Sequence, residues 1–230
     1  MANVVKHPEE KNPTTQPVHH GGRTEQFWQK NSKIIIIALS AVILLVAGYL
    51  VYESQFKAPA ELKAADAMWK AEDYYRKDSA RLALNGDGPN AGFLKIMSRH
   101  SGTKAANLAK FYAGSCYLKL GDFNNAIKYL KDFKADDKLV MVRATGLLGD
   151  AYSETGKKNE AAEAYKKAGT LFPDDHFNSS EYLFRAGLLY QDMGKNKEAI
   201  ETFKLIRDKY RATERGAEID KYLARLGEYE

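Results

Sequence analysis

The sequence contains a single cysteine, Cys116, among its 230 residues. One thiol cannot form an intramolecular disulfide or a cysteine-based metal site, so the cysteine count leaves the redox compartment open. No basic residue adjoins Cys116 in the sequence, and a low-pKa nucleophilic thiol usually needs one. We therefore interpret Cys116 as a small core residue.

The motifs that carry most enzymatic chemistry are also missing. The sequence has no GxSxG, HExxH, P-loop or CxxC pattern. His100 and His176 fall at expected helix ends or loops without a partnered cysteine or serine, and the pair His19-His20 has no third ligand nearby. We predict a non-enzymatic protein with no catalytic residue, no bound metal and no cofactor.

A concentrated charge of one sign is lacking as well. The formal net charge is only +5, from 35 Lys and Arg against 30 Asp and Glu, and it is spread along the chain. Nucleic-acid-binding proteins usually gather their basic residues on one face or along one helix. The absence of such a stripe argues against a nucleic-acid partner.

One long apolar run stands out against this polar background. Residues 34–52 carry no charge and would span roughly 28 Å as a helix, close to the thickness of a bilayer core. A cleavable signal peptide is the main alternative, but its apolar region would extend over only about 7–15 residues. We predict an uncleaved transmembrane helix at 34–52, followed by a linker at 53–60.

The residues before this run predict its orientation. Residues 1–33 hold several prolines and glycines and little that could pack, so we expect a disordered tail. Lys30 and Lys33 lie next to the apolar run, and basic residues favour the cytoplasmic side. We predict a single-pass protein of the inner (cytoplasmic) membrane with a cytoplasmic N-terminus and a periplasmic C-terminal domain.

Three later segments share one pattern at fixed offsets. Each has a glycine followed three residues later by tyrosine, then a second glycine, then an alanine and a large apolar residue. The second glycines are Gly121, Gly156 and Gly194, which lie 35 and 38 residues apart (156 − 121 and 194 − 156). This pattern resembles the tetratricopeptide repeat (TPR), a helix–turn–helix unit of about 34 residues.

The resemblance implies an all-α fold in which antiparallel helix pairs stack into an α-solenoid. The predicted repeats cover residues 107–140, 142–175 and 180–213, and a capping helix follows at 214–230. Ahead of them, residues 61–105 continue the pattern as a degenerate helical pair. Within that pair we expect one helix over 60–84, a break at 85–92 and a second helix from Phe93.

Stacked repeats bind partners mainly on the concave face that their first helices form. Phe111 and Ser115 stand where the carboxylate-clamp subset of TPR domains has lysine and asparagine, and Arg185 is left alone, so we expect no such clamp. The groove is predicted to be more apolar, unless the first or last helix covers it. The candidate positions are Leu108, Phe111, Ser115, Arg143, Gly146, Asp150, Glu181, Phe184 and Leu188.

The order of tail, anchor and repeats resembles the YfgM-type family of membrane-anchored proteins, ancillary subunits of the SecYEG translocon. Residues 83–133, 137–157 and 218–226 carry the resemblance, which extends over about 25–230. It implies a scaffold whose partners are the translocon, periplasmic chaperones or translocating chains. A scaffold for another envelope process, such as cell-wall or outer-membrane assembly, is the alternative, with an enzyme regulator third. Formation of a homo-oligomer stays open.

Overall fold

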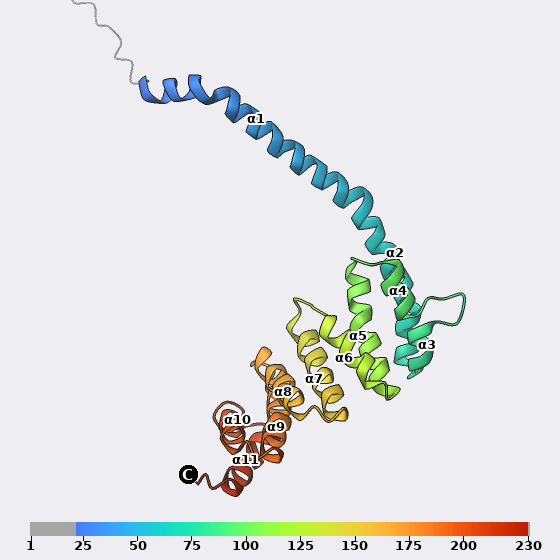
Figure 1. Cartoon of the computed structure of the whole chain (residues 1–230), viewed down its shortest axis with the longest axis vertical. Coiled ribbons are helices and arrows are strands. Elements are labelled where there is room, and N and C mark those ends of the chain that lie inside the picture. The colour runs from blue at the N-terminus through green and yellow to red at the C-terminus, as the bar shows by residue number, and fades with distance from the viewer. Residues whose placement is uncertain (1–21, 230) are drawn as a thin grey trace, which may run out of the picture. The chain divides into compact units, whose positions relative to one another are not determined.

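The structure, a computed structural model, describes residues 22–229, with the side chains at 23–26 left aside. It divides into a unit of Met1–Glu53 and a unit of Ser54–Glu230. Both described parts are helical, and the only pairing of strand type among the described residues is the isolated bridge between Gly86 and Ala91. The predicted all-α fold is confirmed, with one long apolar helix ahead of TPR-like helix pairs (Figure 1).

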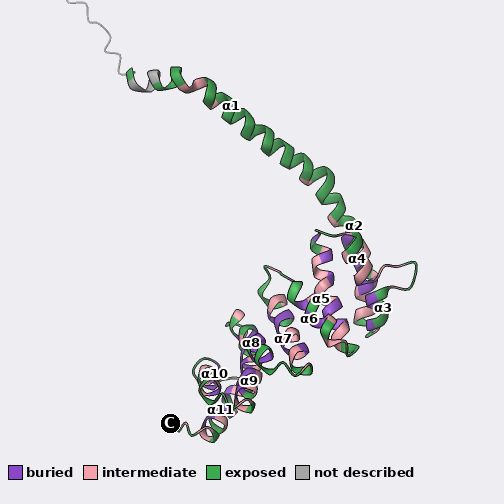
Figure 2. Ribbon diagram, viewed as in Figure 1, coloured by how far each residue is buried: buried purple, intermediate pink, exposed green. Residues whose placement is uncertain are grey.

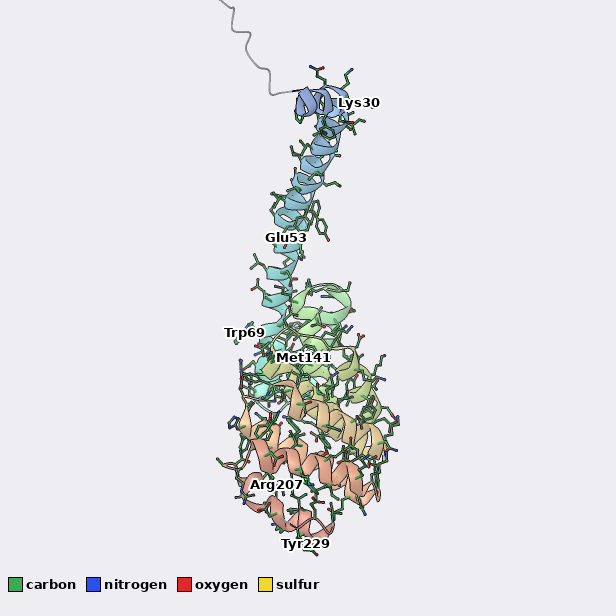
Figure 3. All side chains as sticks on the ribbon, turned by 90° about the vertical axis from the view of Figure 1, so that its left-hand side faces the viewer. Lys30, Glu53, Trp69, Met141, Arg207 and Tyr229 are labelled. Atoms are coloured by element: carbon green, nitrogen blue, oxygen red, sulfur yellow. The ribbon has the colours of Figure 1, made fainter. Side chains whose placement is uncertain are left out.

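The first unit is formed by helix α1, Gly22–Tyr52. Apart from half-buried Ile35, the residues of the apolar run are exposed, and Figure 2 shows most of this helix in green. Lys30 and Glu53, labelled in Figure 3, lie on either side of the uncharged residues 34–52. By length and composition alone, this helix can cross a membrane.

The helix begins earlier than the sequence analysis expected. Residues 22–33 are helical, so the expected disorder does not hold for that part of the tail, and residues 1–21 lie outside the described residues. Adding a residue to an existing helix costs far less than nucleating one, so an apolar helix readily extends into polar sequence. The side chain of Asn31 also donates to the carbonyl of Phe27 at 2.9 Å.

The expected linker at 53–60 is helical too. A π-helical segment, Glu53–Lys57, precedes helix α2, Ala58–Arg76. Pro59 falls in the first turn of α2, directly after the π-helical segment. Residues 53–60 are therefore helical throughout, and the chain contains no extended linker at this point.

The degenerate first repeat has three helices where two were expected. The predicted helix over 60–84 is divided into α2 and α3, Ala80–Asn85, by Asp78, whose φ of 57° is left-handed. The amide of Ser79 donates to the carbonyl of Tyr74 at 2.9 Å and closes this turn. After the predicted break, α4 spans Phe93–Arg99 and buries Phe93 completely.

Three regular helix pairs and a last helix complete the second unit, and neighbouring helices pack side by side in chain order (Figure 1). Their buried residues form a core between successive helices, purple in Figure 2. The elements are α5 Lys104–Lys119, α6 Phe123–Asp132, α7 Lys138–Glu154, α8 Lys158–Leu171, α9 His176–Asp192, α10 Asn196–Lys209 and α11 Glu214–Arg225.

Each regular pair is held together where a glycine of the first helix meets a large side chain of the second. A Cβ added to Gly187 would lie 2.2 Å from the ring of Phe203, and one added to Gly149 would lie 2.6 Å from Tyr165. Gly114 approaches Leu130 in the same way, at 2.5 Å. The side chain of the second helix thus fills the space that a Cβ on the glycine would occupy.

A second glycine of each pair forms the turn between its two helices. Gly121, Gly156 and Gly194 have φ values of 76°, 71° and 70°, in the left-handed region that favours glycine. The two glycine positions that repeat along the sequence therefore have separate roles, one in helix contact and one in chain reversal.

We predict that Gly187→Ala destabilises the protein. Alanine favours a helix interior over glycine by about 1 kcal/mol, but its Cβ must displace the ring of Phe203, and overpacking of this kind costs about 1–3 kcal/mol. We expect a net loss of about 1 kcal/mol in the free energy of unfolding, measured by urea denaturation with circular dichroism. Phe203→Leu in the same chain should relieve the clash, and a Gly187→Ala variant more stable than the native protein would contradict the packing described.

Candidate functional site

An apolar surface of the second unit lies along α2, α5 and α7, the first helices of successive units. Two adjoining hollows of about 470 and about 460 Å³ follow these helices, and Glu72 and Leu108 line both. We call the two together the N-terminal groove. Its apolar lining is Leu62, Ala65, Met68, Trp69, Tyr75, Ala105, Leu108, Phe111, Tyr112, Leu139 and Val140.

Three large apolar side chains of the N-terminal groove are exposed to solvent. Leu62 is 68% exposed, Trp69 is 62% exposed and Leu139 is 55% exposed. Trp69 projects from α2, where Figure 3 labels it. Contiguous exposed apolar patches mark interaction sites, and tryptophan is among the residues that contribute most to binding.

The predicted positions on α5 and at the start of α7 fall in or beside this groove. Leu108 is half-buried, Phe111 is buried beneath the surface, and the exposed Arg143 lies at the rim. Ser115 is buried, and its hydroxyl shares a 2.8 Å hydrogen bond with the hydroxyl of Tyr75 on α2. Ser115 therefore joins two helices, and its hydroxyl is already paired within the protein.

The predicted acidic positions farther along already have partners inside the protein. Asp150 on α7 accepts hydrogen bonds from Tyr165 at 2.7 Å and from Arg185 at 3.1 Å. Glu181 on α9 accepts from Arg185 at 2.9 Å and from Arg215 of α11 at 2.8 Å. We call these five residues the C-terminal ion network, which ties α7, α8, α9 and α11 together.

The last helix covers the apolar positions at this end. Phe184 is only 5% exposed, because the ring of Tyr222 packs edge-on at 4.9 Å and the guanidinium of Arg215 lies 4.4 Å from its centre. Leu188, one turn further along α9, is 37% exposed. Gly146 on α7 is buried and has no room for a Cβ, which would lie 2.3 Å from Tyr182. The expected groove is thus open along α2, α5 and α7 and covered at α11.

Ionisation at the C-terminal network follows from its contacts. Burial raises the pKa of the Glu181 carboxyl, but the hydrogen bonds from Arg215 and Arg185 outweigh burial and hold that pKa below its usual value.

Elsewhere, burial raises the pKa of the Cys116 thiol to about 12, so the thiol stays protonated. Among residues 22–229, no group of three or more His, Cys, Asp or Glu is arranged to hold a metal ion.

The strongest apolar residues of the N-terminal groove escaped the sequence analysis. Leu62, Ala65 and Trp69 form a second stripe on α2 beside the buried stripe of Ala64 and Met68. The spacing is visible in the sequence, since residues three and four apart share a helix face.

Comparisons with known proteins agree with this architecture. One family model described as "Tetratricopeptide repeat" matches residues 142–175. A second model with the same description matches residues 108–137 and 181–213. No curated protein matches the sequence. Among solved structures, "Crystal structure of MamA protein" matches with a TM-score of 0.51 and 20% identity, covering 71% of this chain and 89% of that chain. That likeness concerns the fold alone.

We predict that Glu181→Gln weakens the attachment of α11 and flattens the acid sensitivity of the protein. The native pKa of Glu181 is depressed, so its stabilisation is present above the unfolded value near 4.5 and is lost as the pH falls through the folded value. Losing charge-assisted bonds at this partly exposed site should cost about 1 kcal/mol at neutral pH. Urea denaturation between roughly pH 7 and pH 3 measures both effects.

The matched control is Glu201→Gln on α10, which removes the same charge from an exposed residue. We expect that variant to keep the native pH dependence of stability. An unchanged pH dependence in Glu181→Gln would show that the C-terminal ion network contributes nothing to holding α11.

Proposed function

Because the chain carries three tetratricopeptide repeats after an apolar helix, we propose that it is a membrane-anchored scaffold for proteins. Repeats of this family generally mediate protein–protein contacts and lack catalysis of their own. In this proposal α1 crosses the membrane once, and the unit Ser54–Glu230 presents the N-terminal groove to a partner.

One observation carries the proposal, namely the three exposed apolar side chains of the N-terminal groove. Leu62, Trp69 and Leu139 come from two helices far apart in sequence and meet one lining of apolar residues. The exposed rim residue Arg143 forms no ion pair among residues 22–229, which leaves a cation free beside the apolar surface. This combination suits a partner segment with apolar side chains and an acidic residue.

The location of the scaffold is proposed from α1 and its flanks. Residues 34–52 are uncharged and, apart from half-buried Ile35, exposed, as expected of a helix that meets lipid. Lys30 and Lys33 precede them and favour a cytoplasmic N-terminus. The repeats would then lie in the periplasm, on the outer side of the inner membrane.

The proposed process is protein export at the SecYEG translocon. Its support is the resemblance of residues 25–230 to the YfgM-type family, which implies contacts with the channel, periplasmic chaperones or translocating chains. The groove at α2, α5 and α7 is the surface that we assign to those contacts.

We predict that Trp69→Asp combined with Leu139→Asp abolishes partner recovery. Both side chains are exposed, so the fold should persist while the apolar surface is interrupted. Purification in gentle detergent with mass spectrometry should recover translocon or chaperone components with the native chain and at least tenfold less with the double variant. Phe177→Asp is the control, since Phe177 is 72% exposed outside the groove.

The possible outcomes distinguish the proposed scaffold function from the proposed role in protein export. Absence of every translocon and chaperone component, under conditions that keep the channel intact, would refute the export role. Recovery of cell-wall or outer-membrane assembly enzymes that also depends on Trp69 would support a scaffold for another envelope process. Equal recovery with the groove variant and the native chain would refute the N-terminal groove as the binding surface.

The proposed orientation has a separate test. A reporter enzyme that is active only outside the cytoplasm, fused to the C-terminus, should be active in the full chain. Because the basic residues beside the apolar run set the preference, Lys30→Glu with Lys33→Glu should reduce the fraction of active reporter. A reporter that works only in the cytoplasm would reverse the topology and remove the proposed periplasmic partners.

A further inference from the structure

The second helix of the first regular repeat is one turn shorter than its counterparts. Helices α6, α8 and α10 all begin two residues after a turn glycine, but α6 has 10 residues while α8 and α10 have 14 each. The difference lies entirely at the C-terminal end of α6, which stops at Asp132. One absent turn removes about 5 Å of helix beside α8.

Side chains of α5 stabilise this early end. Asn107 donates to the carbonyl of Lys134 at 2.5 Å, and Lys110 donates to the carbonyl of Asp132 at 3.3 Å. Phe133 adopts an extended conformation and is buried, with its ring centre 5.6 Å from that of Phe111. The carbonyl of Asp132 at the helix end and that of Lys134 just beyond it are thereby paired, so side chains of α5 hold the chain at this early end.

The absent turn leaves a cleft of about 650 Å³ between α6, α7 and α8. Half-buried Met141, Leu148 and Tyr152 of α7 form its apolar floor, together with buried Leu130. At about 100° per residue, these positions of α7 lie roughly 140–180° around the helix from Arg143, which borders the N-terminal groove. We call this hollow the outer cleft, and it opens on the side opposite to that groove.

The two walls of the outer cleft differ in charge. Exposed Lys131 and Lys134 come from the end of α6 and the residues just after it, whereas α8 contributes exposed Glu160 and Glu163 together with one exposed lysine, Lys167, so that wall is acidic on balance. In the part of the chain that the structure describes, Lys131, Lys134 and Glu160 form no ion pair, and Glu163 accepts a hydrogen bond from Tyr190 at 2.6 Å. The walls therefore do not neutralise each other across the cleft.

We propose that the outer cleft binds an amphipathic helix of a protein partner. Its apolar stripe would cover the floor of Met141, Leu148 and Tyr152, and its two flanks would carry acidic residues toward Lys131 and Lys134 and basic residues toward Glu160 and Glu163. A helix in a groove presents an apolar stripe with a separate flank on each side, which an extended chain or an acyl chain does not. The charge pattern of the walls selects this occupant, and the proposal is independent of the N-terminal groove.

The test uses three synthetic helical peptides of about 18 residues with the same leucine stripe. One carries glutamate on one flank and lysine on the other, one carries glutamate on both flanks, and one carries lysine on both. Fluorescence anisotropy is measured with the full chain in lipid nanodiscs, and binding to empty nanodiscs is subtracted. We expect the mixed-flank peptide to bind about tenfold more tightly than either of the others, because only it matches both walls.

A variant in which both walls of the outer cleft carry negative charge provides a second test. Lys131→Glu with Lys134→Glu makes the α6 wall acidic, and the α8 wall stays acidic on balance with its two glutamates and Lys167, so the preferred peptide should become the one with lysine on both flanks. Lys197→Glu with Lys209→Glu is the matched control, because it changes the net charge equally at exposed residues of α10. Circular dichroism verifies that both variants keep the native helix content.

Several outcomes would overturn the proposal. The proposal fails if no peptide binds, if all three peptides bind equally tightly, or if the control variant and the wall variant show the same change in the order of peptide affinities. Equal binding of a proline-containing, non-helical version of the mixed peptide would replace the helix with an extended segment as the occupant. Self-association of the chain that disappears in the wall variant, without peptide binding, would assign the outer cleft to a second copy.

Discussion

The architecture depends on one recurring contact, in which the first helix of each pair lacks a Cβ where the second helix presents a large side chain. Gly114, Gly149 and Gly187 accept Leu130, Tyr165 and Phe203 at distances that no methyl group would allow. The contact sets how near the two helices lie, and so how deeply each pair packs against the next. The stacked core depends on this spacing.

The same repeating residues explain which parts of the fold could be predicted from the sequence. Glycines, tyrosines and alanines at fixed offsets predicted the three regular pairs, because helix contact and chain reversal each demand a particular residue type. The division at Asp78 was not predicted, since a non-glycine residue with positive φ leaves little local signal. The expected linker at residues 53–60 is helical in the structure, and Pro59 does not exclude a helix there because proline is compatible with a first helical turn.

The sequence indicated some of the residues that border the N-terminal groove, but it did not indicate which of the candidate positions are accessible. Leu108 and Arg143 border an open groove, whereas Asp150, Glu181 and Phe184 are engaged by the C-terminal ion network and by α11. Whether a helix at the end of a stack covers the repeat before it depends on long-range pairs such as Glu181 with Arg215, which no local pattern encodes.

The length of α6 has a consequence for how a repeat protein can acquire new surfaces. Its missing turn opens the outer cleft, while α5 and α7 remain in contact on the other side. A deletion at the end of a second helix therefore leaves the order and alignment of the first helices intact. The two faces of such a stack are free to diverge separately, so that a single short domain can gain a second recognition surface without giving up the first.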